Sequence, residues 1–123
     1  MLRCLPVALL LAPLPAAAQD FECRNTAAET RCGDGACEVE TQAFTPMQLS
    51  RKGARITLCA YSGCREGPIL MRRARGALTL LFAEVRGSVP GAGAPESLAV
   101  IYDSAGRTAQ MRWGGFANAM GCG

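Results

Sequence analysis

Residues 98–113, with the sequence LAVIYDSAGRTAQMRW, decide the fold class of this chain. Residues 98–102 and 108–113 follow the two-residue period that is typical of β-strands. Between them, Asp103-Ser104-Ala105-Gly106 places an acceptor side chain at the start of a turn and a glycine at its end. The segment therefore predicts an antiparallel β-hairpin.

The same strand period recurs along the chain. Further strands are predicted at residues 20–24, 37–44, 47–50, 55–61, 68–73, 77–85 and 116–122. Residues 79–83 (TLLFA) are apolar on both faces, which places their strand centrally. Residues 88–95 (SVPGAGAP) have the composition of a loop. About eight short strands without a long helical period predict an all-β fold, a small antiparallel β-sandwich or barrel.

One local exception is expected near the beginning of this pattern. Thr26 and Glu29 stand at capping-box spacing, in which each side chain satisfies a free backbone amide of the other residue. One helical turn is therefore predicted within residues 25–31.

The first 18 residues read as an export signal. Arg3 precedes an apolar run at residues 5–14, and small alanines end the segment at Ala18. The run is shorter than the roughly 20 residues that span a bilayer, so we predict cleavage after Ala18 and no membrane span afterwards. Residues 19–123 are then a single domain in the periplasm or outside the cell.

Six cysteines follow this signal: Cys23, Cys32, Cys37, Cys59, Cys64 and Cys122. An even set in an exported chain predicts a disulfide-stapled domain. The equal spacing of Cys32 with Cys37 and of Cys59 with Cys64 favours two local bonds, which leaves Cys23 for Cys122. Crossed pairings among the first three cysteines remain open. No C-x-x-C pair is present, which disfavours zinc binding and catalytic thiol exchange.

Histidine is absent from the chain, so the commonest general base and metal ligand is missing. Glu38 and Glu40 have a spacing that glycosidases use, but they share one wet strand face and hence one environment. Lys52 sits in a predicted turn, where solvent keeps it protonated and unsuited to activate a serine such as Ser62. We therefore predict no enzyme, with no catalytic, cofactor-binding or metal-binding residues.

Charge is distributed unevenly although the net charge is only +3. Residues 19–40 hold six acids and two arginines, whereas residues 51–75 hold seven bases and one acid. The candidate partner-binding residues in the basic segment are Arg65, Arg72, Arg73 and Arg75. Arg112-Trp113 is a second candidate, because both residue types are enriched at interfaces. The modest net charge does not favour nucleic acid as a partner.

Three segments carry a family resemblance: the cluster Cys23, Cys32 and Cys37, residues 58–64 (LCAYSGC), and Gly121-Cys122. They resemble small exported cysteine-containing proteins of unknown function from Gram-negative bacteria. The chain is also weakly similar to periplasmic lysozyme inhibitors, small β-barrels with a Ser-Gly-x-x-Tyr loop that enters the lysozyme cleft. Ser62-Gly63 match the start of that loop, whereas Glu66 stands in place of its tyrosine.

These observations predict a non-enzymatic exported domain, a binding or inhibitor-like module for an envelope protein or glycan. The alternative is a structural or stress-related envelope protein without a dedicated ligand site. The two differ in where residues 51–75 place their arginines, which converge beside a groove in the first case and disperse in the second.

Overall fold

The computed structural model describes residues 19–61, 63–89, 91 and 93–123. The predicted signal peptide, residues 1–18, lies outside the described residues. The described chain forms ten strands: β1 (Phe21–Arg24), β2 (Glu29–Gly33), β3 (Ala36–Glu40), β4 (Met47–Lys52), β5 (Arg55–Ala60), β6 (Gly63–Arg75), β7 (Leu78–Gly87), β8 (Glu96–Asp103), β9 (Thr108–Trp113) and β10 (Phe116–Cys122). Within the described ranges, no helix is long and apolar enough to cross a membrane.

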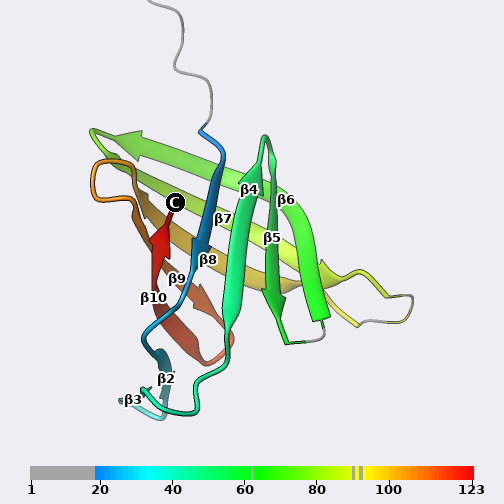
Figure 1. The fold of residues 1–123 in the computed structure, drawn as a ribbon. Helices are drawn as coiled ribbons and strands as arrows, with labels where there is room; N and C mark the ends of the chain where they lie inside the picture. The colour runs from blue at the N-terminus through cyan, green and yellow to red at the C-terminus, as the bar shows by residue number, and fades with distance from the viewer. Residues whose placement is uncertain (1–18, 62, 90, 92) are drawn as a thin grey trace, which may run out of the picture.

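Eight of these strands close an antiparallel barrel, which confirms the predicted all-β class and selects a barrel over a sandwich. The strands follow in the order β1, β4, β5, β6, β7, β8, β9 and β10, and β10 pairs again with β1. β2 and β3 form a hairpin attached beside β10, at the lower end of the barrel in Figure 1. β6 and β7 extend beyond the barrel at its upper end.

The hairpin predicted from residues 98–113 is present as β8 and β9. These strands pair from Leu98 with Trp113 to Asp103 with Thr108. β6 begins at Gly63, five residues before its predicted start, because its ladder with β5 begins at the Ala60–Gly63 pair and includes Cys59–Cys64. The predicted strand at 37–44 ends earlier, at Glu40.

The helical turn predicted within residues 25–31 is wrong, because β2 begins at Glu29. Glu29, one of the two residues expected to form the capping box, instead binds a backbone group far along the chain, and so does the neighbouring Asn25. Asn25 and Glu29 both contact Thr45, whose backbone lies close to them in the fold. Tertiary contacts therefore override the short capping pattern.

Alternate residues of the barrel strands point inward and form one core. Its largest fully buried apolar side chains are Leu49, Ile56, Leu58, Leu81, Val85, Leu98 and Val100. Three of the four methionines after the signal, Met47, Met111 and Met120, are also buried there, as expected for residues that fill core gaps. The inner surface is thus filled by side chains, and binding surfaces must lie outside or at the ends.

The β6–β7 pair approaches so closely at one point that only glycine fits. A Cβ on Gly67 would lie 1.7 Å from the Glu84 carbonyl oxygen. The register of this pair shifts between Ile69 and Met71. The close approach and the shift lie on the part of β6 that leads to its arginine-rich end.

Three disulfides staple the fold, and they are the pairs that spacing favoured: Cys23–Cys122, Cys32–Cys37 and Cys59–Cys64. Cys23 pairs with Cys122 across the strands that close the barrel, so this bond locks the closure covalently. The other two bonds each lie within one hairpin. Such a frame is typical of proteins in an oxidising, extracytoplasmic environment.

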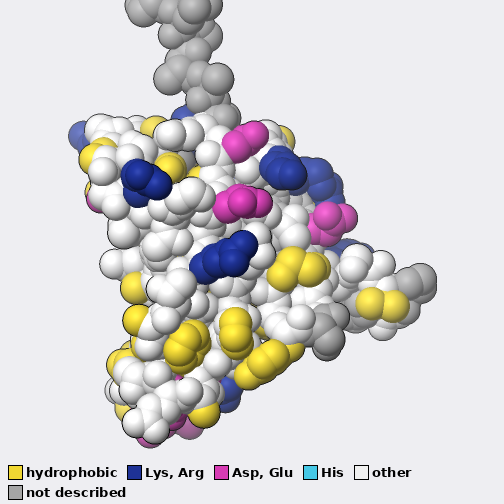
Figure 2. All heavy atoms as spheres, viewed as in Figure 1, with side chains coloured by type: hydrophobic (Ala, Val, Ile, Leu, Met, Phe, Trp, Pro, Cys, Tyr) yellow, Lys and Arg dark blue, Asp and Glu magenta, His cyan; other side chains and the backbone are white. Residues whose placement is uncertain are grey.

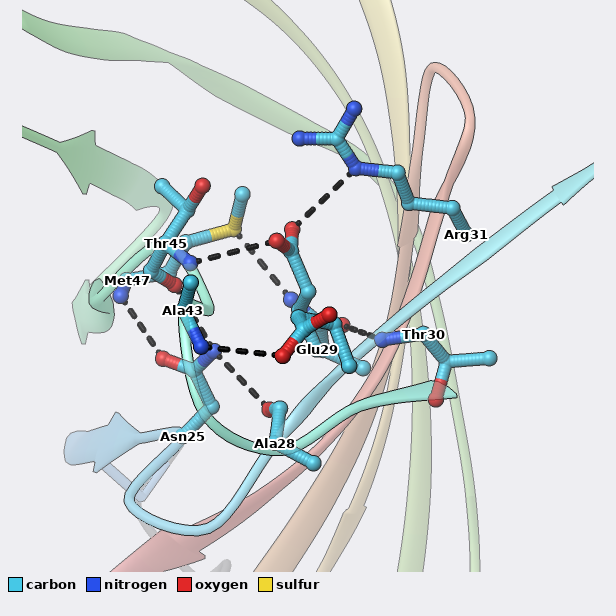
Figure 3. Close-up of polar contacts among 10 residues, drawn as sticks. Asn25, Ala28, Glu29, Thr30, Arg31, Ala43, Thr45 and Met47 are labelled. Carbon is cyan, nitrogen blue, oxygen red and sulfur yellow. Dashed lines mark hydrogen bonds and ion pairs between the residues drawn. The ribbon is translucent and has the colours of Figure 1, made fainter. Parts of the chain in front are cut away.

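A buried polar network joins the β2–β3 hairpin to the barrel (Figure 3). The Asn25 side chain donates to the carbonyl oxygens of Ala28 and Thr45 and accepts from the Met47 amide at 2.7 Å. These bonds fix the chain on both sides of the hairpin, at residues 25–28 and 45–47.

Glu29 and Asn118 complete the network. The Glu29 carboxylate accepts from the Thr45 amide and from the Arg31 guanidinium, both at 3.3 Å. Asn118, on β10, accepts from the Thr30 amide at 2.8 Å (Figure 3). Since buried polar groups are costly unless they are hydrogen-bonded, these pairings indicate a structural anchor.

Candidate functional site

The candidate site is the outer surface of β6 to β10, where outward-facing residues align in three rows across the strands. We call these rows the apolar face. They are Arg75–Leu78–Asp103–Thr108, then Arg73–Leu80–Ile101–Gln110–Ala119, then Met71–Phe82–Ala99–Arg112–Ala117. Directly opposed residues in antiparallel strands share one side of the sheet, so each row lies on the same surface.

Three aliphatic side chains at the centre of the apolar face are open to solvent. Leu78 is 50% exposed, Leu80 38% and Ile101 45%. Leu80 and Ile101 line two adjoining hollows, one of about 410 Å³ over β7 to β10 and one of about 360 Å³ toward β6. The apolar face is therefore a continuous, shallow surface that crosses the barrel wall.

The arginines of the apolar face flank its aliphatic centre on both sides, on β6 and on β9. Arg73 and Arg75 line the smaller hollow from β6, and Arg112 lines the larger hollow from β9. The three rows contain one acid, Asp103, whose carboxylate accepts from the amides of Ala105 and Gly106 in its own turn. The rows thus contain three arginines and one acid.

The structure separates the four predicted arginines. Arg73 and Arg75 come together on the apolar face. Arg72 alternates to the other side of β6, opposite the buried Leu81, and lies at the upper end of the barrel. Arg65 lies ten residues before Arg75, near the beginning of the strand.

Arg65 is engaged in a stack at the lower end of the barrel. Its Nε donates to Glu96 at 2.7 Å, and its guanidinium lies 4.9 Å from the centre of the Trp113 ring. Trp113 stacks on Phe116, and Arg31 covers Phe116 at 4.9 Å. Each of the two arginines contacts a carboxylate and an aromatic ring. The stack therefore stabilises the lower end of the barrel and does not leave its arginines free for a partner.

The second sequence candidate, Arg112-Trp113, divides in the same way. Arg112 points outward to the apolar face, whereas Trp113 lies on the inner side and packs against the core. Neighbouring residues on a strand point to opposite faces, so the two side chains cannot serve one surface.

The aliphatic centre of the apolar face was not identified as a site from the sequence, although residues 79–83 carried its signal. Their two apolar faces indicated a strand covered on both sides. The barrel covers one side only: Leu81 and Ala83 are buried, and Leu80 is exposed. An apolar outward position next to Arg73 and Arg75 is the feature that locates the candidate surface.

The opposite wall of the barrel, formed by β1, β4 and β5, has different chemistry. We call its outward residues the polar face: Glu22, Arg24, Gln48, Ser50, Lys52, Arg55 and Thr57. Figure 2 views this wall and shows basic and acidic side chains intermingled over its upper half, with hydrophobic side chains gathered lower down. Charges of both signs here give no preference for a partner of one sign.

The residues considered for catalysis are dispersed. Glu38 and Glu40 lie exposed on β3, and Lys52 is exposed at the end of β4. Ser62 lies outside the described residues. In the part of the chain that the structure describes, no three cysteine, aspartate or glutamate side chains form a potential metal site.

No protein-family model matches the chain, and neither a curated protein nor a solved structure shows significant similarity to it.

Proposed function

We propose that this protein is an exported, non-enzymatic binding module, periplasmic or secreted, whose apolar face docks an acidic, amphipathic segment of another envelope protein. One observation carries the proposal: Leu78, Leu80 and Ile101 form an exposed aliphatic surface bordered by arginines. Exposed apolar surfaces with polar rims are typical of interaction sites, and arginine and methionine are enriched at such sites.

The partner's apolar residues would contact the centre of the apolar face. Leu78, Leu80 and Ile101 are each about half exposed, so covering them gains about 1 kcal/mol per side chain. The surface is aliphatic and shallow, which suits a protein segment better than a glycan. A glycan would require more hydrogen-bonding groups than Gln110 and the rim arginines supply.

The partner's acidic residues would contact the three arginines of the apolar face, which we call the rim. Arg73, Arg75 and Arg112 present guanidinium groups that bind carboxylates in bidentate geometry. A second copy of this chain is a poor occupant, because it would bring its own arginines to the interface. Charge complementarity therefore selects an acidic partner and predicts binding that weakens as salt rises.

The experiment is affinity capture from an envelope extract at low salt, with three forms of the oxidised protein. They are the wild type, a rim variant (Arg73→Gln, Arg75→Gln and Arg112→Gln) and a control variant that removes three charges from the polar face (Arg24→Gln, Lys52→Gln and Arg55→Gln). We expect the wild type and the control variant to retain the same partner and the rim variant to lose it.

Equal capture by the rim variant would overturn the assignment of the interface. Absence of any salt-sensitive partner for the wild type would instead support the alternative function, a structural or stress-related envelope protein. Because the control removes as many charges as the rim variant, a general loss of charge cannot explain a selective effect.

A further inference from the structure

A buried arginine at the upper end of the barrel has no carboxylate partner. Arg51 projects inward from β4, between Phe21 and Ile56 in the strand register, and is 4% exposed. Its Nε donates to the Gly53 carbonyl oxygen at 3.0 Å. The ion pairs among the residues that the structure places do not include Arg51.

This position is electrostatically unfavourable for a cation. Burial lowers the pKa of Arg51 below its usual range, and the charge of Arg72 lowers it further, while Asp20 acts in the opposite direction. A buried charge is costly unless an opposite charge or several hydrogen bonds compensate it. A single backbone carbonyl supplies only part of that compensation.

Arg51 opens into a hollow of about 410 Å³, a size typical of small-molecule sites. The hollow lies where the N-terminal end of β1, the β4–β5 turn and the turn at residues 104–107 meet, at the upper end of the barrel in Figure 1. Lys52 and Arg107 also line it. It is separate from the apolar face, so an inference from it does not depend on the proposed function.

Asp20 and Glu22 share this hollow with Arg51, and the charge of Asp20 favours the Arg51 cation, but neither forms an ion pair with it. Asp20 and Glu22 line the hollow, and the Asp20 carboxylate accepts from the Gly53 amide at 2.8 Å. The stacked rings of Phe21 and Tyr102, with centroids 4.4 Å apart, form an apolar wall beside them. Three cations (Arg51, Lys52 and Arg107), two acids and an apolar wall therefore surround one space, with an excess of positive charge among these side chains.

We propose that this hollow binds the oxyanion group of a small molecule, a carboxylate or a phosphate. The two terminal amino groups of Arg51 donate to the anion, and Lys52 and Arg107 add positive charge at the rim. Arg72 on β6, whose charge acts on Arg51, adds to the positive potential there. The aromatic wall bounds the uncharged part of the ligand.

The test measures binding to the oxidised protein by thermal unfolding and by two-dimensional NMR, with inorganic phosphate, acetate and benzoate against sodium chloride at equal ionic strength. We expect at least one oxyanion to raise the melting temperature above that in chloride, because a ligand that binds the folded state stabilises it. The amide resonances of Gly53 and residues 104–107 should shift. The phosphate and carboxylate arms separate the two ligand chemistries.

Three variants decide the assignment. Arg51→Met should weaken binding about tenfold or more, which is the loss expected for charge-assisted hydrogen bonds. Without ligand it should be as stable as the wild type or more so, because it removes an uncompensated buried charge. Arg107→Gln, in an exposed turn, should weaken binding several-fold, and Arg73→Met on the apolar face should leave binding unchanged.

Oxyanion effects no larger than those of chloride in the wild type would overturn the proposal. Equal binding by the wild type and Arg107→Gln would overturn it even if Arg51→Met failed to fold. Equal partner capture by the wild type and the rim variant would overturn the proposed function and leave this result unaffected, so the two proposals fail separately.

Discussion

The apolar face and the polar face lie on opposite walls of the same barrel, and they differ in the side chains that they present to solvent. On the polar face, outward positions carry charges of both signs and hydroxyl groups, as expected for the wet side of an amphipathic sheet. On the apolar face, Leu78, Leu80 and Ile101 occupy equivalent positions. Folding needs the inward residues of both walls, but it does not need aliphatic side chains on the outside of one wall.

Inward side chains of the barrel strands determine the fold, so only the outward side chains are free to differ according to function. A polar outer face satisfies solubility and requires no further explanation. An aliphatic outer face lowers solubility, and its place beside arginines is the feature on which the proposed docking surface rests. Both faces should depend on the same barrel core and differ only in their outward side chains.

The largest effect should come from opening the barrel, which would destroy both faces together. Removing the Cys23–Cys122 bond by double alanine substitution should cost about 4.7 kcal/mol, because this bond closes a loop of about 100 residues. Removing the Cys32–Cys37 bond should cost about 2 kcal/mol, since its loop is short. Chemical denaturation of both variants checks the ranking, and equal losses would contradict it.

A smaller loss of stability should follow from a change in β6 and β7, which carry part of the apolar face but none of the polar face. Gly67→Ala places a methyl group against the Glu84 carbonyl and should destabilise the protein by about 3 kcal/mol. Gly63→Ala on the same strand meets no atom within 4 Å and is the matched control. Hydrogen exchange should show faster opening of β6 and β7 in the first variant, and similar stability of the two variants would refute the close approach.

The third prediction compares neighbouring residues that point in opposite directions. Ile101→Thr should change the free energy of unfolding by about 0.5 kcal/mol or less, because the side chain is half exposed. Val100→Thr buries a hydroxyl group in the core and should cost about 1–3 kcal/mol. A large loss of stability in Ile101→Thr would show that the apolar face serves folding.

The smallest effect concerns the β2–β3 hairpin, which belongs to neither face. The pKa of Glu40 lies below its usual 4.5, mainly because its carboxylate accepts hydrogen bonds from the backbone amides of Ala43 and Gln42. A lowered pKa in the folded state adds stability above pH 4.5, and that stability is lost as the pH falls through the lower value.

An NMR titration of Glu40 should therefore show its lowered pKa. The Glu40→Gln variant should lose the pH dependence of the 41–43 turn below pH 4.5. Glu38→Gln removes one charge from the same strand and should leave that turn unchanged. A Glu40 titration at or above the usual value would contradict the observed hydrogen bonds.

The fold was largely predictable from the sequence, because most strands follow a clear alternation and the cysteine spacing favoured local pairs. Closure of the barrel was less accessible. It depends on β1 pairing with β10 across nearly the whole chain, which no strand pattern specifies and which the predicted Cys23–Cys122 bond alone indicated. The predicted turn at 25–31 is wrong because the distant Thr45 backbone competes for the Glu29 side chain of the capping pattern.

The candidate site was predictable only in part. The basic segment correctly drew attention to β6, but alternation sends Arg72 and Arg73 to opposite sides of the strand, so four arginines in sequence become two on one surface. Arg112 joins them from β9, which the sequence places far away. Arg51 was counted among the basic residues, and nothing in its local sequence indicates burial without a carboxylate.

Site-specific photo-crosslinking in cells tests the central claim most directly. A photo-reactive residue is placed at position 101 on the apolar face or at position 57 on the polar face. Position 101 should yield a crosslink to an acidic segment of one envelope protein, and Arg73→Gln with Arg75→Gln should abolish it. The same product from both positions, or none from position 101 in folded, exported protein, would contradict the account.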